Sequence, residues 1–138
     1  FLNISCPINE KTRHLIGEKE LKKMKKSAFL INSSRGPVVD ETALVRALRE
    51  GWIQGAGIDV FEQEPPLANN PLFKLENVIL TPHSIALTDE FYIIMWEDIT
   101  QQIIQMIQGE KPMTLVNPEV WAKPEFQAKL KKFHEAIR

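Results

Sequence analysis

The chain has 138 residues and a net charge of −1, with 43% hydrophobic and 25% charged residues. These proportions are those of an ordinary globular protein, and the length suits one domain with a hydrophobic core. The near-neutral charge gives no reason to expect nucleic acid or an anionic membrane as a partner. A single cysteine, Cys6, excludes an internal disulfide framework and is compatible with a reducing compartment, so we expect a cytoplasmic protein.

Four apolar segments have the length and composition of β-strands. They lie at residues 1–5, 27–32, 53–61 and 77–80. The second is a continuous apolar run between polar ends, which is typical of a strand buried on both faces. Strands alternate with helical patterns along the chain, and this order predicts a parallel α/β sheet.

Helical patterns occur in four places, at residues 18–26, 40–50, 88–108 and from Pro124 onward. Asp40 is expected to cap the second helix, which Gly51 ends, and Thr88 is expected to cap the third. The third helix carries apolar residues over more than one stripe, which predicts burial against another domain or subunit. The chain also opens directly on a strand pattern, so we expect it to be the C-terminal portion of a longer protein.

The segment Gly55-Ala56-Gly57-Ile58-Asp59-Val60 has the first two glycines of a phosphate-binding turn. Val60 stands where the third glycine is needed, and the following residues, with two prolines, do not begin the required helix. We therefore expect these glycines to allow a strand to approach its neighbours closely.

Four polar residues follow predicted strands, and they are Arg35, Asp59, Glu64 and His83. The planar guanidinium of an arginine can bind a carboxylate by two parallel hydrogen bonds, and an aspartate can accept a hydrogen bond from an amide. A glutamate beside a histidine stabilises the protonated ring and fixes its orientation, which suits a general acid. Because the carboxyl ends of parallel strands meet at one edge of a sheet, these residues are candidates for a single site.

Each of the four also has a purely structural interpretation, as a surface Arg, a strand-end Asp, a solvated loop Glu and a structural His. Two further histidines, His14 and His134, occur in polar segments without ligand partners at metal spacing, so no metal site is predicted. Cys6 precedes a proline and is interpreted as a packing or contact residue rather than a nucleophile.

These residues stand in motifs that resemble the D-isomer-specific 2-hydroxyacid dehydrogenases, which include glycerate/hydroxypyruvate, phosphoglycerate and phosphite dehydrogenases. The matching stretches are SCPINEKTRHLIG, LINSSRGPVVDETALVRALREGWIQGAGIDVFEQEPP, NPLFKLENVILTPH and, more loosely, VNPEV. They cover nearly all of residues 1–120 in the family's order. Just after the histidine, where many relatives have Ile and then a small residue, this chain has Ser84 and Ile85.

The resemblance implies a role for each candidate. Arg35 would bind the substrate carboxylate and its 2-oxo oxygen, and His83, paired with Glu64, would exchange a proton with that oxygen. Asp59 would accept a hydrogen bond from the nicotinamide carboxamide. The positions that the resemblance places along an NAD or NADP cofactor are Cys6, Pro7, Thr12, Ser33, Ser34, Arg35, Asp59, His83 and Ser84.

The implied fold is the second half of a Rossmann-type parallel-sheet nucleotide-binding domain in residues 1–109. Residues 110–138 would be a tail and helix that return to a substrate domain outside this chain. The family also implies a small 2-hydroxy or 2-oxo acid as substrate and a homodimer formed through the nucleotide-binding domain. Two alternatives are a non-catalytic NAD-sensing protein such as the family's co-repressors, and formate dehydrogenase, which is disfavoured because it carries Gln where Glu64 stands.

Overall fold

The structure is a computed structural model, and it describes residues 1–136. They divide into two units, residues 1–86 and the described residues from 87 onward, and each unit is described by itself. The expected division into 1–109 and 110–138 concerns the domains of a longer protein and stays a prediction.

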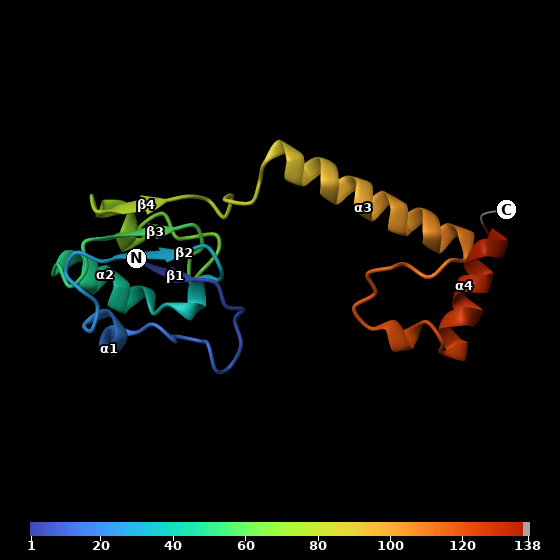
Figure 1. The fold of residues 1–138 in the computed structure, drawn as a ribbon, viewed down its shortest axis with the longest axis horizontal. Coiled ribbons are helices and arrows are strands. Elements are labelled where there is room, and N and C mark those ends of the chain that lie inside the picture. The colour runs from blue at the N-terminus through green and yellow to red at the C-terminus, as the bar shows by residue number, and fades with distance from the viewer. Residues whose placement is uncertain (137–138) are drawn as a thin grey trace. The chain divides into compact units, whose positions relative to one another are not determined.

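The first unit is built on a parallel sheet of four strands in the order β1-β2-β3-β4 (Figure 1). The strands are β1 (Leu2–Ile4), β2 (Phe29–Asn32), β3 (Gly55–Ile58) and β4 (Val78–Leu80). Each strand pairs in parallel with the next along the chain. The predicted α/β class and parallel sheet are confirmed. Gly55 and Gly57 lie within β3, so this segment is a strand and not a phosphate-binding turn.

Two helices lie on one side of this sheet, α1 (Glu18–Leu21) and α2 (Glu41–Arg49) (Figure 1). The Asp40 carboxylate accepts a hydrogen bond from the Ala43 N–H at 3.0 Å, so the predicted cap of α2 is present. The inward face of α2 is buried together with Leu30 and Ile58 of the sheet. Helix α1 ends earlier than predicted, because the backbone after Leu21 continues in tighter turns, such as the bond from Met24 N–H to Leu21 O.

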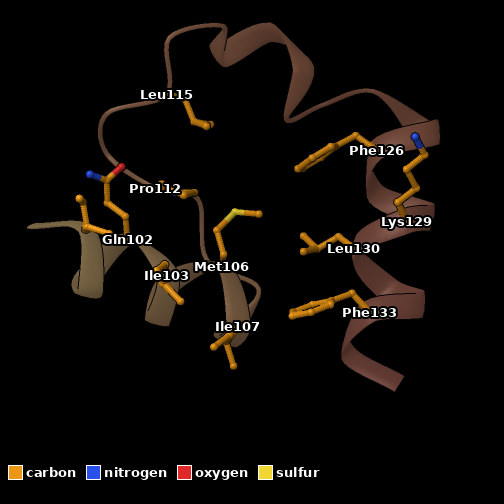
Figure 2. A pocket seen from close by; sticks show the side chains of 11 residues that line it. Gln102, Ile103, Met106, Ile107, Pro112, Leu115, Phe126, Lys129, Leu130 and Phe133 are labelled. Atoms are coloured by element: carbon orange, nitrogen blue, oxygen red, sulfur yellow. The ribbon is translucent and has the colours of Figure 1, made fainter. Parts of the chain in front are cut away.

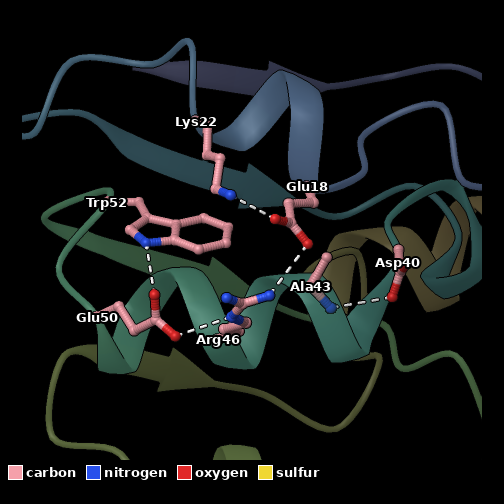
Figure 3. A network of polar contacts seen from close by, with 7 residues as sticks. All are labelled: Glu18, Lys22, Asp40, Ala43, Arg46, Glu50 and Trp52. Atoms are coloured by element: carbon pink, nitrogen blue, oxygen red, sulfur yellow. Dashed lines mark hydrogen bonds and ion pairs between the residues drawn. The ribbon is translucent and has the colours of Figure 1, made fainter.

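A polar network connects α1 with α2 on the surface (Figure 3). Glu18 forms an ion pair with Lys22 of its own segment and a second one, at 3.3 Å, with Arg46 of α2. The hydrogen bond from Lys22 lowers the pKa of the exposed Glu18 carboxyl, with Arg46 adding to the effect. Exposed pairs of this kind fix the packing of two elements without contributing much stability.

The opposite face of the sheet is more open than the sequence predicted. Leu30 and Asn32 of β2 are buried, whereas Phe29 is 39% exposed and its ring stacks on that of Phe1. On β4, Ile79 is 74% exposed. The prediction that β2 is buried on both faces is therefore wrong, because α1 and α2 cover only the other side of the sheet.

The second unit consists mainly of α3 (Asp89–Gln108) and α4 (Pro124–Ala136). The Thr88 hydroxyl accepts from the Phe91 N–H at 3.2 Å, and Gly109 ends α3 in the left-handed conformation with φ of 81°. Apolar side chains of both helices, including Met106, Leu130 and Phe133, line a hollow of about 580 Å³ between them (Figure 2). No residue of α3 is buried within the described residues, and the expected burial of this helix against another domain or subunit stays a prediction. None of the described helices is long and apolar enough to cross a membrane.

Candidate active site

The carboxyl ends of the four strands place the candidate residues along one edge of the sheet. Arg35 follows β2, Asp59 directly follows β3, and His83 follows β4. Because the strands are parallel and adjacent, the three loops leave the sheet on the same side. Ligands of open parallel sheets bind outside this edge.

The loop that carries Arg35 is organised by Asn32, the last residue of β2. Asn32 is only 1% exposed, and its amide donates to the Arg35 carbonyl oxygen at 3.1 Å. Its side-chain oxygen accepts from the Ser34 N–H at 3.1 Å and from the Ser34 hydroxyl at 2.9 Å. A buried amide with all these partners holds the loop in one conformation. The Arg35 side chain itself is exposed, and its Nη1 donates to the Ser34 carbonyl oxygen at 2.6 Å.

Gly36 brings the Arg35 loop into direct contact with the segment that follows β3. A Cβ atom at Gly36 would lie 1.8 Å from the Phe61 carbonyl oxygen and 2.5 Å from the Glu62 nitrogen. Real Cβ atoms essentially never approach this closely, so only glycine fits at this position. The loops after β2 and β3 therefore touch through their backbones.

Asp59 holds the loop that carries His83. Its carboxylate accepts from the Thr81 hydroxyl at 2.5 Å, from the Ser84 N–H at 2.9 Å and from the Ile85 N–H at 3.2 Å. The His83 N–H donates to the Asp59 carbonyl oxygen at 2.8 Å. Burial raises the pKa of this carboxyl, but the hydroxyl and the two backbone N–H groups outweigh burial and hold the pKa below its ordinary value.

These contacts explain how Ser84 and Ile85 are tolerated where many relatives have other residues. Both bind Asp59 through their backbone N–H groups, which any residue other than proline supplies. The change of side chains therefore leaves this anchor of the loop intact.

His83 and Glu64 form a hydrogen-bonded pair. The His83 Nδ1 atom lies 2.9 Å from Glu64 Oε2, and the other carboxylate oxygen, Oε1, accepts from the Phe61 N–H at 3.0 Å. His83 has a φ of 54°, in the left-handed region that residues other than glycine seldom adopt. The exposed fraction is 48% for the His83 side chain and 38% for the Glu64 side chain. Among the described residues no protein group binds the second ring nitrogen, Nε2.

Two hollows adjoin these residues. One, of about 420 Å³, lies beside the His83–Glu64 pair and is walled mainly by apolar groups, among them Phe61, Phe73 and Leu80. The other, of about 560 Å³, lies at the ends of β1 and β2, and its lining is about half polar. This second hollow is lined by Ile4, Ser5, Cys6, Pro7, Ile8, Ser33, Ser34 and Arg35.

The structure thus brings together some of the predicted site residues and leaves others apart. Glu64 and His83 are in contact, and Cys6, Pro7, Ser33, Ser34 and Arg35 share the second hollow. Thr12 does not line it, because its hydroxyl is directed back to the Pro7 carbonyl oxygen at 2.7 Å. No hydrogen bond connects Arg35 with His83 or Glu64 among the described residues.

Sequence reasoning missed three residues that shape the site: Asn32, Thr81 and Glu62. The sequence pattern indicates Asn32 only as the polar end of a strand. A polar side chain that ends an otherwise apolar strand could have indicated a residue that binds the following loop. Glu62 binds His14, which lies 48 residues away, and no local pattern indicates such a pair. Among residues 1–136 no group of three or more His, Cys, Asp or Glu side chains could hold a metal ion.

Comparison with known proteins places this arrangement in a family. Residues 1–84 match the family model described as "D-isomer specific 2-hydroxyacid dehydrogenase, NAD binding domain". A glyoxylate reductase of Korarchaeum cryptofilum is 50% identical over 120 residues, which are 87% of this chain and 36% of that protein. The chain therefore spans about a third of the length of such a relative.

Solved structures agree with this result. A D-isomer specific 2-hydroxyacid dehydrogenase of Lactobacillus delbrueckii, in its NAD-complexed form, superposes with a TM-score of 0.77 at 35% identity. The match covers 83% of this chain and 39% of that one. A member from Xanthobacter autotrophicus, in complex with NADPH and MES, superposes with a TM-score of 0.68 at 35% identity, over 86% and 48% of the two chains.

The parallel sheet with helices is that of a Rossmann-like nucleotide-binding fold, as the superposition on solved 2-hydroxyacid dehydrogenases shows. With a family model matched over more than half of its residues, the chain belongs to the D-isomer specific 2-hydroxyacid dehydrogenase family.

Proposed function

We propose that the full-length protein is an NAD(P)-dependent oxidoreductase that interconverts small 2-hydroxy and 2-oxo acids with D specificity, with this chain supplying the acid–base group. The observation that carries the proposal is the His83–Glu64 pair at the carboxyl edge of the sheet, with Nδ1 of the ring bound to the carboxylate. This bond fixes the ring and leaves Nε2 available to exchange a proton with a substrate oxygen.

Glu64 orients the ring of His83 through its bond to Nδ1. Its second oxygen is held by the Phe61 N–H, so the carboxylate does not rotate away from the histidine. A protonated His83 donates from Nε2 to the 2-oxo oxygen during reduction and takes the proton back during oxidation. A fixed donor where negative charge develops is the kind of group that lowers such a barrier.

Arg35 is the proposed ligand of the substrate carboxylate. Nη1 of its side chain is held by the Ser34 carbonyl oxygen, and the rest of the guanidinium is exposed at the end of β2. A planar guanidinium can bind a carboxylate by two hydrogen bonds, which fixes both the position and the orientation of a small acid.

The hollow at the ends of β1 and β2 suits the polar half of a dinucleotide. It combines the Ser33 and Ser34 side chains with the Cys6–Pro7 turn, and about half of its lining is polar. The nicotinamide of a cofactor bound in this way would supply or accept the hydride. The residues that would line the cofactor are Cys6, Pro7, Ser33, Ser34 and Arg35. Asp59 would stand next to the carboxamide, and among the described residues its Oδ2 accepts only from the Ile85 N–H. The remaining predicted cofactor contacts are His83, Ser84 and Thr12. His83 and Ser84 are bonded to Asp59 through their backbone N–H groups. The Thr12 hydroxyl would have to break its bond to the Pro7 carbonyl oxygen in order to bind a cofactor.

The relatives support the substrate class. The Korarchaeum protein is named as a glyoxylate reductase, and glyoxylate is a small 2-oxo acid. The solved relatives were obtained with NAD in one case and NADPH in another, so both cofactors are candidates here. A cytoplasmic location and a homodimer through the nucleotide-binding domain belong to the same proposal. The exposed apolar side chains of α3, such as Ile94 and Trp96, are compatible with such an association.

The test is the reduction of glyoxylate, hydroxypyruvate or pyruvate by NADH or NADPH, with the full-length protein and its His83→Gln variant. We expect turnover by the wild type and a loss of at least a hundredfold in kcat in the variant, with the affinity for the cofactor retained. Normal turnover by His83→Gln would exclude the proposed role. Cofactor binding without turnover of any 2-oxo acid by the wild type would instead favour a non-catalytic NAD-sensing protein.

A further inference from the structure

His14 and Glu62 form a second histidine–glutamate pair. The Nε2 atom of His14 lies 2.6 Å from Glu62 Oε1, and since a carboxylate only accepts, the ring nitrogen donates. The His14 backbone N–H donates to the Pro37 carbonyl oxygen at 2.8 Å. His14 has a φ of 51°, so its backbone is held in the left-handed region that seldom occurs outside glycine.

Glu62 is fixed on both sides of its carboxylate. Oε2 accepts from the Glu41 N–H at the start of α2 at 3.2 Å, and the Glu62 N–H donates to a Glu41 carboxylate oxygen at 3.0 Å. The other oxygen of Glu41 accepts from the Asn70 amide at 2.7 Å. Glu62 is therefore anchored to helix α2 at one oxygen and to His14 at the other.

Glu62 is two residues away from Glu64, the partner of His83. Residues 61–64 thus form a short segment in which Glu62 binds His14 and Glu64 binds His83. The Phe61 N–H binds Glu64, and the Phe61 carbonyl oxygen is packed against Gly36. A shift of Glu62 would be transmitted to Glu64 through only one intervening residue.

His14 also holds the segment that carries Arg35. Its N–H binds the Pro37 carbonyl oxygen, two residues beyond Arg35, while its ring binds Glu62, two residues before Glu64. One residue thereby connects the loop of the proposed carboxylate ligand with the loop of the proposed acid–base pair.

We infer that His14 is a positioning residue that, through Glu62, sets the spacing between Arg35 and the Glu64–His83 pair. This inference rests on the proposed function. The His14 and Glu62 side chains are 42% and 31% exposed, and ion pairs of this exposure contribute little to stability. Misplacement of reacting groups by about 1 Å costs up to about a hundredfold in rate. The loss of His14 should therefore appear in kcat and not in thermal stability.

The test uses His14→Asn in the full-length protein, because asparagine tolerates the left-handed backbone but does not reach Glu62. We expect kcat for reduction of the best 2-oxo acid to fall about tenfold, with the cofactor KM and the Tm nearly unchanged. Glu62→Gln should show a loss of similar size, because one carboxylate oxygen is replaced by a donor, and the double variant should be no worse than either single variant. The matched control is Gln63→Ala, an exposed side chain of the same loop, which should keep full activity.

The Glu64→Gln background separates the possible outcomes. If His14 acts through the Glu64–His83 pair, His14→Asn should cost less than about twofold in kcat once Glu64 is replaced. An equal loss in both backgrounds, or His14→Asn and Glu62→Gln variants as active as Gln63→Ala, would overturn the inference. If Glu64→Gln itself left turnover unchanged, the proposed function would be at fault and not the role of His14.

Discussion

At the scale of single residues, the site is defined by a few hydrogen bonds with distinct tasks. Asn32 and Asp59, at the ends of β2 and β3, are 1% and 4% exposed and bind backbone groups of the neighbouring loops. Arg35 and His83, which are the groups proposed to meet the substrate, are far more exposed. The buried polar residues thus hold the loops in place, and the exposed Arg35 and His83 side chains remain accessible to a substrate.

Arg35→Lys tests the proposed carboxylate ligand. A lysine keeps the positive charge but lacks the planar pair of donors, so the two parallel hydrogen bonds to a carboxylate are lost. We expect the KM for the 2-oxo acid to rise at least tenfold, with the KM for the cofactor changed much less. Steady-state kinetics on the full-length protein measure both, and an unchanged substrate KM would remove Arg35 from this role.

Asp59→Asn tests the anchor of the His83 loop. The amide presents donors where the carboxylate accepted from the Thr81 hydroxyl and two N–H groups, so exchange of the Ser84 and Ile85 amide hydrogens should become about tenfold faster. Hydrogen-exchange mass spectrometry of the peptide after Leu80 measures this at pH 7. As control we choose Asp40→Asn, because asparagine caps a helix about as well as aspartate.

The same carboxyl has a definite pH dependence. Its pKa in the folded protein is lowered, so the stabilisation from Asp59 is present above the unfolded value of about 3.9. It is lost as the pH falls through the lower folded pKa. In Asp59→Asn this part of the acid destabilisation should be absent, and an unaltered acid limb would show that the carboxylate is not the group involved.

At the scale of elements, two backbones meet where the loops after β2 and β3 cross at Gly36. In Gly36→Ala the new Cβ would lie 1.8 Å from the Phe61 carbonyl oxygen, so one of the two loops has to move. We expect a loss of about 1–3 kcal/mol in stability, as for other overpacked sites, together with reduced turnover. Gly57→Ala is the matched control, since the nearest atom to its Cβ is Ile31 Cγ1 at 4.0 Å. Thermal unfolding of both variants should separate them clearly, and equal Tm values would contradict the close approach.

The elements themselves were largely predictable from local signals. Asp40, Thr88 and Gly109 mark helix ends by capping chemistry, and the apolar runs mark all four strands. Exposure was not predictable in the same way, because an apolar run has the same composition whether one face or both faces of the strand are covered. Phe29 and Ile79 are exposed for this reason.

Candidate site residues could be selected only where their position after a strand gave a reason to select them. Arg35, Asp59, Glu64 and His83 met that condition, and the contact between Glu64 and His83 is present. The support behind them was not predictable, because the bond between His14 and Glu62 spans 48 residues of sequence. Such pairs arise from the crossing of loops in three dimensions, for which a linear pattern has no signal.

At the scale of the whole molecule, the proposed function requires a phosphate-binding element for the cofactor, and no such element is present in residues 1–138. The Gly55–Gly57 segment forms part of β3, and the sequence contains no glycine-rich phosphate-binding turn. We therefore expect the isolated 138-residue chain to bind NADH at least a hundredfold more weakly than the full-length protein and to reduce no 2-oxo acid. Fluorescence titration with NADH measures both affinities, and circular dichroism of the same sample verifies that the chain is folded. Micromolar binding by the folded chain would mean that the hollow at the ends of β1 and β2 provides most of the affinity by itself.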